Sequence, residues 1–405
     1  MPTRDIHRTL CNRDCPDACA ILATVEDGRV TRLRGDPEHP ITRGSLCFRT
    51  NRFLERQYSP DRLQTPLVRK DGALVPVSWD EALDRVAQRL VAIRDESGPA
   101  SIFHYRSGGS LGLLKQVVDR FFSDFGPVTT KRGDICSGAG DAAQLEDFGE
   151  EDSHDIMDLL EARNIVLWGK NLVTSSPHIL RIVKDARARG AKIVLIDPVM
   201  HATTHHVDCT YSVRPGFDFA LVMATIAICF RESWIDPNVH DFCDGVDALR
   251  SLATSRSIEA WCKVADVSID VVRDLAERFG RKGPTAILVG WGLGRRTNGS
   301  ATVRAIDALS AITGNIGISG GGSSLYFKRR GAFDVAAIAP TRPPPRTILE
   351  PCFGREVMEA NDPPIRAVFV TCGNPVAMLP DSRAVDHALA TRDFVVVVDS
   401  FLTDT

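Results

Sequence analysis

Four cysteines in the first fifty residues constrain this chain more than any other feature. Three lie in CNRDCPDAC, with three residues between Cys11 and Cys15, three between Cys15 and Cys19, and a further 27 before Cys47. Three thiolates from one loop and a fourth from a distant turn can close around a metal centre. The dense spacing, with Pro16 stiffening the loop, favours an iron–sulfur cluster. A structural zinc ion and unligated thiols are the alternatives.

The overall composition is that of an α/β protein with more than one domain. The 405 residues exceed the usual size of a single core. A net charge of −3, with 43% hydrophobic and 25% charged residues, gives no attraction for nucleic acid or an anionic membrane. No segment has the ~18 uninterrupted apolar residues of a membrane span, since LVMATIAICF ends at Arg231.

The remaining cysteines and the N-terminus indicate a reducing compartment. Eleven scattered cysteines are not a disulfide framework, and we expect six of them to be reduced, small apolar side chains: Cys209, Cys229, Cys243, Cys262, Cys352 and Cys372. MPTRDIHRTL has neither an apolar stretch nor a twin-arginine pair, which predicts a cytoplasmic protein.

The segment after Cys19 predicts a small antiparallel sheet, because two alternating runs flank the turn residues Asp27-Gly28. The order CxxxCxxxC, DGRVTRLRGDPEHPITRGSLC, YSPDRLQTPL and SWDEAL resembles the start of the molybdopterin oxidoreductases, the dimethyl sulfoxide reductase and formate dehydrogenase superfamily. The resemblance runs from Cys11 to the last residue. It implies a 4Fe–4S cluster beside molybdenum or tungsten held by bis(molybdopterin guanine dinucleotide).

Beyond this module, strands and helices alternate. Ser78 and Glu81 form a capping box before EALDRVAQRLVAI, and NIVLWGKN, PHILRIVKDARARG and AKIVLIDP form a βαβ unit ending its helix at Gly190. Further strands are TAILVGWGLG, RAVFVTCGNP and FVVVVDSF. We therefore predict an α/β fold: an iron–sulfur β module at 1–60 and two doubly wound, Rossmann-like parallel-sheet domains. One is split between 61–130 and 325–405, and the other, 131–324, is inserted in it.

Several of these strands end in residues suited to a dinucleotide. Ligands bind at the carboxyl ends of parallel strands, although a lone glycine there is more often simple turn chemistry. As a set, these loops match those that contact the dinucleotides in the family. The resemblance implies one guanine dinucleotide at Asn171, Asp197 and Asp218 and a second at Gly373, Asn374 and Asp399, with Gly169, Gly292 and Gly294 as further cofactor-binding residues. The carboxylates would accept hydrogen bonds from the guanine N1–H and 2-amino groups.

Cys136, in KRGDICSGAGD, is the predicted protein ligand of the molybdenum or tungsten, because the family places this ligand in such a segment. The alternatives are a buried thiol, with Ser137 as the ligand or with neither residue bound. Formate dehydrogenases of the family have a histidine after this ligand, and Ser137 stands there instead. That difference argues against formate as substrate.

Arg49, two residues after Cys47, occupies a place where related enzymes keep a lysine or arginine between cluster and pterin. A cation beside a negatively charged cluster raises its reduction potential. A solvated arginine among its basic neighbours is the alternative.

The resemblance implies a catalytic subunit, or its N-terminal part, that moves two electrons to or from a small-molecule substrate and passes them singly to an electron-transfer partner. Family members continue past DSFLTDT, so we expect a truncation or a separate chain that supplies the C-terminal pterin-binding domain. Two alternatives are a scaffold subunit that keeps the cluster without molybdenum and a non-redox hydratase on the same fold. Cys136 and the strand-end loops favour an enzyme.

Overall fold

The computed structural model describes residues 3–13, 15, 17–150, 154–327 and 334–405; Pro16 lies outside these ranges. Its N-terminal module is an antiparallel sheet of β1 (Arg4–Leu10), β2 (Ala20–Glu26) and β3 (Arg29–Gly35). The predicted turn joins β2 to β3, with positive φ at Asp27 and Gly28. The loop of the first three cysteines joins β1 to β2, and Cys11 N donates to Cys19 O at 2.9 Å.

Short helices and a hairpin follow the module. Cys47 is the N-cap of α1 (Phe48–Asn51), and α2 (Phe53–Gln57) comes next. A two-stranded hairpin, β4 (Leu67–Lys70) and β5 (Ala73–Pro76), precedes α3 (Trp79–Ser97). Ser78 caps α3 by accepting a hydrogen bond from Glu81 N at 3.1 Å, so the predicted helix start is confirmed.

Two five-stranded parallel sheets form the rest of the molecule, which confirms the predicted fold class. The first contains β6 (Ile102–Arg106), β7 (Thr129–Arg132), β13 (Thr347–Leu349), β14 (Ala367–Thr371) and β15 (Phe394–Val398). The second contains β8 (Asn164–Trp168), β9 (Lys192–Ile196), β10 (Cys209–Tyr211), β11 (Thr285–Val289) and β12 (Gly322–Ser324). The chain leaves the first sheet after β7 and returns at β13, and β7 spans the boundary expected at 130/131.

Both sheets have the same strand order. The order is β13-β7-β6-β14-β15 in one and β10-β9-β8-β11-β12 in the other. Numbered within its own sheet, each therefore reads third, second, first, fourth, fifth. In the first sheet, β7 and β13 lie on one side of β6, and β14 and β15 lie on the other. In the second sheet, β9 and β10 lie on one side of β8, and β11 and β12 lie on the other. The order in which strands are added therefore reverses between β6 and β14 and between β8 and β11. These reversals are the places where open parallel sheets bind ligands.

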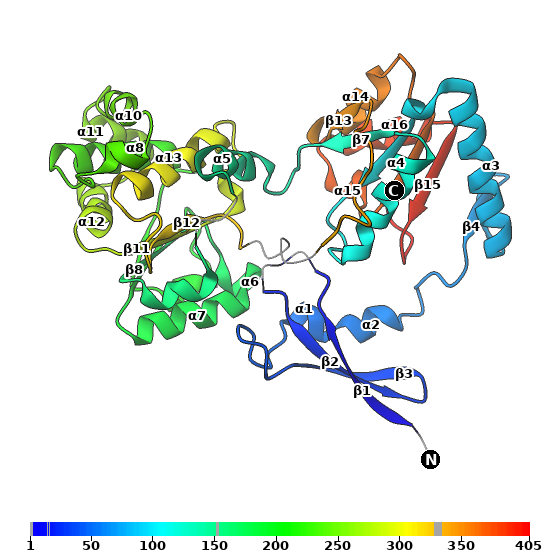
Figure 1. Ribbon diagram of the computed structural model, residues 1–405, viewed down its shortest axis with the longest axis horizontal. Helices are drawn as coiled ribbons and strands as arrows, with labels where there is room; N and C mark the ends of the chain where they lie inside the picture. Colours follow the sequence, from blue (N-terminus) through cyan, green and yellow to red (C-terminus); the bar gives the residue numbers. More distant parts are fainter. Residues whose placement is uncertain (1–2, 14, 16, 151–153, 328–333) are drawn as a thin grey trace.

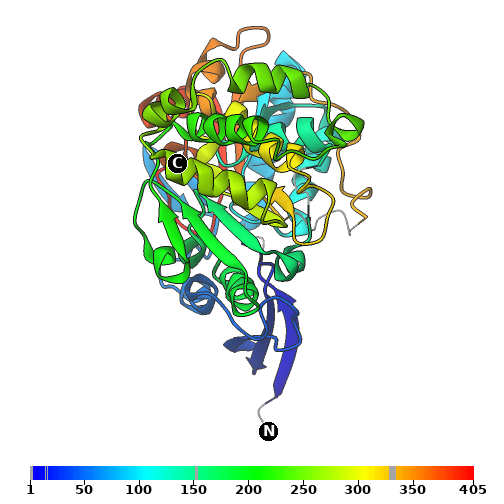
Figure 2. The ribbon, with the colours of Figure 1, turned by 90° about the vertical axis from the view of Figure 1, so that its left-hand side faces the viewer.

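Each sheet lies between two helix layers because alternate strand residues face opposite sides. In the second sheet, Ile165 and Leu167 pack with α7 (Pro177–Ala188), whereas Val166 and Trp168 pack with α8 (Asp218–Arg231). The α8 layer also includes α10 (Val246–Ala253), α11 (Ile258–Ala265), α12 (Ile269–Gly280) and α13 (Gly299–Ile312). Figure 2 shows the sheet between these layers.

The first sheet follows the same plan. Phe103 packs with α14 (Phe353–Glu359) and α16 (Ser382–Ala390), and Ile102 packs with α3 and α4 (Val117–Phe125). Shorter or peripheral helices complete the fold: α5 (Gly138–Phe148), α6 (Leu172–Ser175), α9 (Val239–Phe242) and α15 (Pro375–Met378). Among the described residues, no helix is long and apolar enough to cross a membrane.

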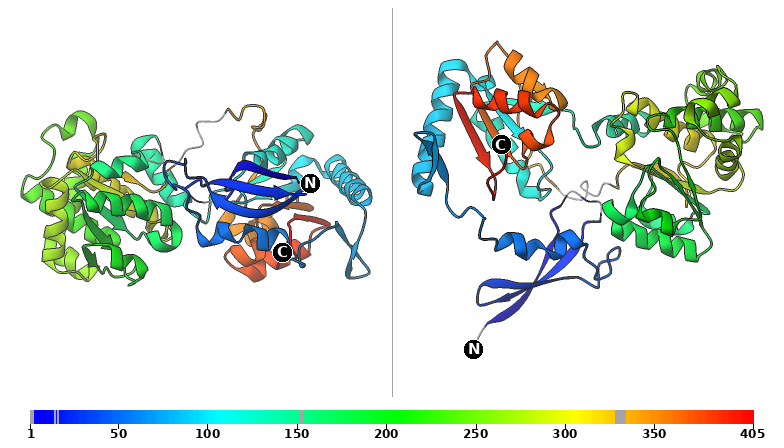
Figure 3. Two further views of the ribbon diagram at one scale, coloured as in Figure 1. Left: turned by 90° about the horizontal axis from the view of Figure 1, so that it is seen from below. Right: turned by 180° about the vertical axis from the view of Figure 1, so that it is seen from behind.

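The two α/β units lie side by side, and the β1–β3 module projects below the joint between them (Figure 1). The views from below and from behind show the same arrangement (Figure 3). The module therefore has access to both units.

Candidate metal and cofactor site

All four N-terminal cysteines line one small cavity, together with Arg49 and Thr50. Thr50 lies on α1 and is buried, and its Oγ1 is 3.5 Å from Cys11 Sγ and 3.4 Å from Cys47 Sγ. The loop between β1 and β2 supplies three thiols, and the start of α1 supplies the fourth. The structure thus brings together residues that are distant in sequence.

The electrostatics of this cavity fit a group that carries positive charge. Burial raises the pKa of Cys15 to about 12, and the Asp17 carboxylate adds to the effect. Burial and the neighbouring Asp17 and cysteine charges also raise the pKa of Cys19. At Cys47, burial raises the pKa, but hydrogen bonds with Thr50 and Arg49 outweigh it, so the pKa is lowered. Four thiolates would be stable here only around metal.

The arrangement of the four thiols is compatible with an iron–sulfur cube. They lie around the wall of one shared cavity. In such a cube each cysteine sulfur binds a different iron, so the four ligands surround the cluster and do not converge on one point as they do around zinc.

The cysteine loop contacts the carboxyl-end loops of both parallel sheets. Towards the second sheet, Asp17 Oδ2 accepts from His178 N at 3.3 Å, at the start of α7. Towards the first sheet, Asn12 O accepts from Leu111 N at 2.8 Å, and Asn12 Nδ2 donates to Ser110 Oγ at 3.1 Å, in the loop after β6. The cavity is therefore next to the carboxyl ends of the strands in both sheets, which is where open parallel sheets bind ligands.

Glycines let the loops approach each other at both topological reversals. A Cβ at Gly109 would lie 2.5 Å from the carbonyl oxygen of Cys372, which follows β14. Likewise, a Cβ at Gly290 would collide with the backbone of Gly169, which follows β8. The exposed backbone of such close loops is suited to a phosphate-containing ligand.

The three residues predicted to bind the first dinucleotide lie at one end of the second sheet, together with the three further glycines predicted to bind cofactor. Gly169 and Asn171 follow β8, Asp197 follows β9, Asp218 begins α8, and Gly292 and Gly294 follow β11. Asp218 is buried, which raises the pKa of its carboxyl group. Its Oδ1 accepts from Trp168 Nε1 at 2.9 Å.

The polar members of this set also have structural roles. Asp197 Oδ1 accepts from Val199 N at 2.8 Å, and Oδ2 is 3.2 Å from His201 Nε2. Asn171 Oδ1 accepts from Thr203 Oγ1 at 3.1 Å and caps α6. A guanine ligand would have to share or replace these hydrogen bonds.

The three residues predicted for the second dinucleotide lie at the carboxyl end of the first sheet. Gly373 and Asn374 follow β14, and Asp399 follows β15. Asn374 Oδ1 accepts from Thr405 N at 3.2 Å, and Asp399 Oδ1 accepts from Phe401 N at 3.2 Å. The two predicted sets therefore occupy equivalent places on two different sheets.

Cys136 lies on the crossover from β7 to α5, which connects the two sheets. Asp134 Oδ1 accepts from Cys136 N, and also from Ser137 N at 3.2 Å. Arg295, in the loop after β11, donates from Nε to Cys136 O at 2.9 Å, and its Nη2 is 3.6 Å from Cys136 Sγ. A half-buried thiol beside a guanidinium is a suitable soft metal ligand.

Three charged residues near these sites were not assigned a role from the sequence. Arg295 contacts Cys136, whereas Asp17 and Lys170 are buried near Cys15. Lys170 and Arg295 belong to WGKN and GWGLGRR, whose glycines had been noted. The sequence signal that could have identified Lys170 and Arg295 is a charged residue next to the glycines that follow a strand.

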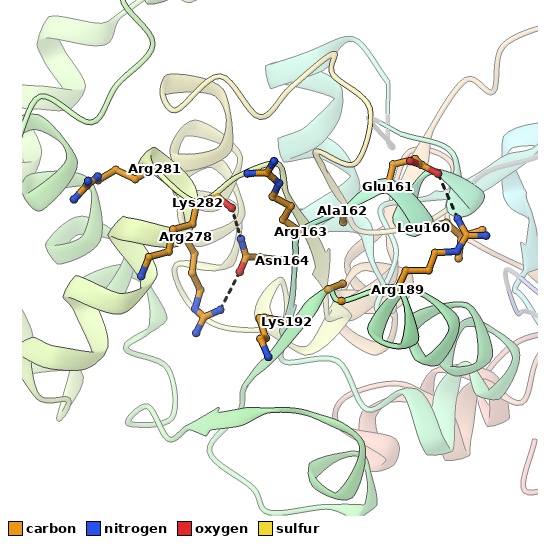
Figure 4. Close-up of a pocket in the computed structure, with 12 residues that line it drawn as sticks. Leu160, Glu161, Ala162, Arg163, Asn164, Arg189, Lys192, Arg278, Arg281 and Lys282 are labelled. Carbon is orange, nitrogen blue, oxygen red and sulfur yellow. Dashed lines mark hydrogen bonds and ion pairs between the residues drawn. The ribbon is translucent and has the colours of Figure 1, made fainter.

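Another cavity lies at the opposite, amino-terminal end of the second sheet. It has a volume of about 810 Å³ and is lined by residues near the amino ends of β8 and β9 (Figure 4). Asn164 Oδ1 accepts from Arg278 Nη1 at 2.9 Å there, and Asn164 Nδ2 donates to Lys282 O at 3.0 Å. It contains none of the predicted site residues, so it is separate from the candidate site.

The chain matches two family models. Residues 62–405 match the molybdopterin oxidoreductase model, and residues 5–59 match the molybdopterin oxidoreductase Fe4S4 domain. These matches imply a molybdopterin cofactor with molybdenum or tungsten and a 4Fe–4S cluster.

Individual relatives agree with the family match. A probable oxidoreductase, YyaE, from Bacillus subtilis is 34% identical over 99% of this chain and 60% of its own length. The F420-dependent formate dehydrogenase subunit alpha of Methanocaldococcus jannaschii is 28% identical over 99% of this chain and 62% of its own length. The chain thus spans about 60% of these relatives.

The fold is also found in a solved structure. Acetylene hydratase from Pelobacter acetylenicus aligns with a TM-score of 0.79 and 19% identity, over 97% of this chain and 60% of that one. At this identity the match describes the fold alone. The family matches, which together cover almost the whole chain, show that this protein belongs to the molybdopterin oxidoreductase family.

Proposed function

We propose that this chain forms the N-terminal part of the catalytic subunit of a molybdenum or tungsten bis(molybdopterin guanine dinucleotide) oxidoreductase. The observation that carries the proposal is the position of the cysteine loop, which hydrogen-bonds to the loop after β6 of the first sheet and to the first turn of α7 beside the second sheet. A cluster there would be close to two dinucleotides bound at the two reversals of strand order. Electrons would then pass singly through the cluster to a partner protein.

The chain's own residues would divide the work as follows. Cys11, Cys15, Cys19 and Cys47 would hold the cluster, and Arg49 would provide a cation on its wall. Asn171, Asp197 and Asp218 would orient one dinucleotide, and Asn374 and Asp399 the other. When bound, the metal supplies the two-electron chemistry on a small substrate.

Cys136 would be the protein ligand to the metal, and Arg295 would hold its loop. Arg295 would fix the loop through the Cys136 carbonyl, and its guanidinium lies beside the Cys136 sulfur. The crossover position suits this role because the segment that contains Cys136 connects the two sheets that would bind the dinucleotides.

For domains, we propose a cluster module at 1–60, a split α/β domain and an inserted one. We put the first split point at about 133 and not at 130, because β7 runs from Thr129 to Arg132. The remainder of the pterin-binding architecture would come from sequence beyond this chain or from a separate polypeptide.

Cofactor analysis of the anaerobically purified protein tests the proposal. The protein would be expressed with the matching C-terminal portion in a host that makes the guanine dinucleotide cofactor. We expect molybdenum or tungsten to co-purify with GMP released by acid, at about two GMP per metal. A protein that contains iron but neither metal nor GMP would contradict the proposal and favour the scaffold alternative.

A matched pair of variants tests the guanine contact in the same assay. Asp218→Ala removes the carboxylate and should reduce GMP retention by roughly tenfold, which corresponds to about 1.4 kcal/mol and is within the cost of leaving hydrogen-bond donors unpaired. Trp168→Phe removes only the indole donor to Asp218, and should retain GMP. Equal losses in both variants would show that Asp218 acts by holding Trp168.

A further inference from the structure

Lys170 is a buried cation with few partners in its own domain. It follows β8, lies between Gly169 and Asn171, and is 9% exposed. Its Nζ donates a hydrogen bond to Val289 O at 3.5 Å. The same atom lies 5.8 Å from the centroid of the Trp291 ring. An ammonium group has three donors, so this environment leaves most of its charge uncompensated by its own sheet.

The compensating charge comes from the cysteine loop. Burial lowers the pKa of Lys170 to about 8, and the opposing, favourable interactions are with Asp17 and Cys15. Asp17 is 1% exposed and lies between two predicted cluster ligands, and its Oδ2 accepts from His178 N. Its Oδ1 has no hydrogen-bond partner among the described residues. Lys170, in the inserted domain, therefore lies near a negatively charged region of the N-terminal module, the part of the cysteine loop that contains Asp17 and Cys15.

That region would become more negative on reduction of a cluster. An iron–sulfur cube bound by four thiolates has a net negative charge, and reduction adds one electron to it. A fixed buried cation interacts more strongly with such a charge than a solvated one, since solvent screening is weak in the interior. Lys170 is on the side of the inserted domain, so it is distinct from Arg49, which belongs to the α1 wall of the cavity.

We propose that Lys170 is a positioning residue that stabilises the reduced cluster and raises its reduction potential from the second sheet. This inference rests on the cluster assignment made in the proposed function. The contact between the inserted domain and the N-terminal module would then have an electrostatic role, because a residue of the inserted domain would influence the reduction potential of the cluster in the module.

The test is a redox titration of the cluster at pH 7, followed by electron paramagnetic resonance. Lys170→Met should shift the reduction equilibrium about tenfold towards the oxidised cluster, which corresponds to about 59 mV for one electron. Lys170→Arg should stay within about threefold of wild type. Lys184→Met removes an exposed lysine from α7 and serves as the control, with no shift expected.

Asp17→Asn provides an independent check, and should shift the equilibrium in the opposite direction because it removes a negative charge. A normal iron content with an unchanged potential in Lys170→Met would overturn the inference. If Lys170→Met does not retain iron, an unchanged potential in Asp17→Asn would overturn it instead. A wild-type protein without iron would overturn the cluster assignment itself, which separates the two failures.

Discussion

Cys136 is the residue on which the proposed chemistry depends. If it binds the metal, X-ray absorption at the molybdenum or tungsten edge should show one sulfur fewer in Cys136→Ala and Cys136→Ser than in wild type, because the dithiolene sulfurs remain. Turnover should be abolished in the alanine variant. Cys243→Ala, at a distant half-buried thiol, is the control. An unchanged sulfur count in the Cys136 variants would identify Cys136 as a structural thiol.

At the residue scale, the sequence identified which residues are candidates for the site, but not which residues surround them. Cysteine spacing and strand-end carboxylates are local patterns. The contact of Arg295 with Cys136 joins residues 159 positions apart, and the proximity of Lys170 to Asp17 depends on how the module docks. No local periodicity encodes such contacts, so they become visible only in three dimensions.

At the scale of elements, the buried Glu350 links the first sheet to the crossover. It is 1% exposed; Oε1 accepts from Tyr105 OH at 2.8 Å, and Oε2 accepts from Lys131 Nζ and Ile135 N, both at 3.0 Å. These bonds join β6, β7 and the segment before Cys136. Glu350 therefore helps to set the position of the Cys136 loop.

Replacing Glu350 should be costly to stability. Glu350→Ala should lower the free energy of unfolding by about 3 kcal/mol, since it leaves Lys131 without its buried partner. Glu350→Gln should cost about 1 kcal/mol because it keeps a hydrogen-bond acceptor. Urea denaturation followed by circular dichroism measures both, with the exposed Glu359→Ala on α14 as control. Similar stability of Glu350→Ala and the control would refute this role.

Long or strongly patterned elements were predictable, and short ones were not. The apolar runs of β8, β9, β11, β14 and β15 and the helices α3 and α7 were identified from sequence, because each has an apolar run or a helical pattern long enough to recognise. Strands β10, β12 and β13 have three residues each, too few for a pattern. Strand β1 is exposed along its whole length, so its sequence has no apolar alternation and only its pairing with β2 defines it.

At the scale of the whole molecule, the sequence predicted two α/β units but not their common strand order. Alternating strands and helices imply parallel sheets, whereas the order of strands depends on which edges pair. Because both units have this strand order, each contains a reversal of strand order, and ligands bind to such sheets at the carboxyl ends of the strands there. The cysteine loop hydrogen-bonds to the loop after β6 in one unit and to the first turn of α7 in the other, and this convergence is the structural basis of the proposed function.

The central claim is that the four cysteines hold one iron–sulfur cube at this convergence. Metal analysis of anaerobically purified protein tests it most directly. We predict about four iron atoms per chain in wild type and in Cys243→Ala. Cys15→Ala should lose the cluster and destabilise the N-terminal module, because metal binding contributes to its folding. Stoichiometric zinc without iron, or a full iron content in Cys15→Ala, would contradict the account.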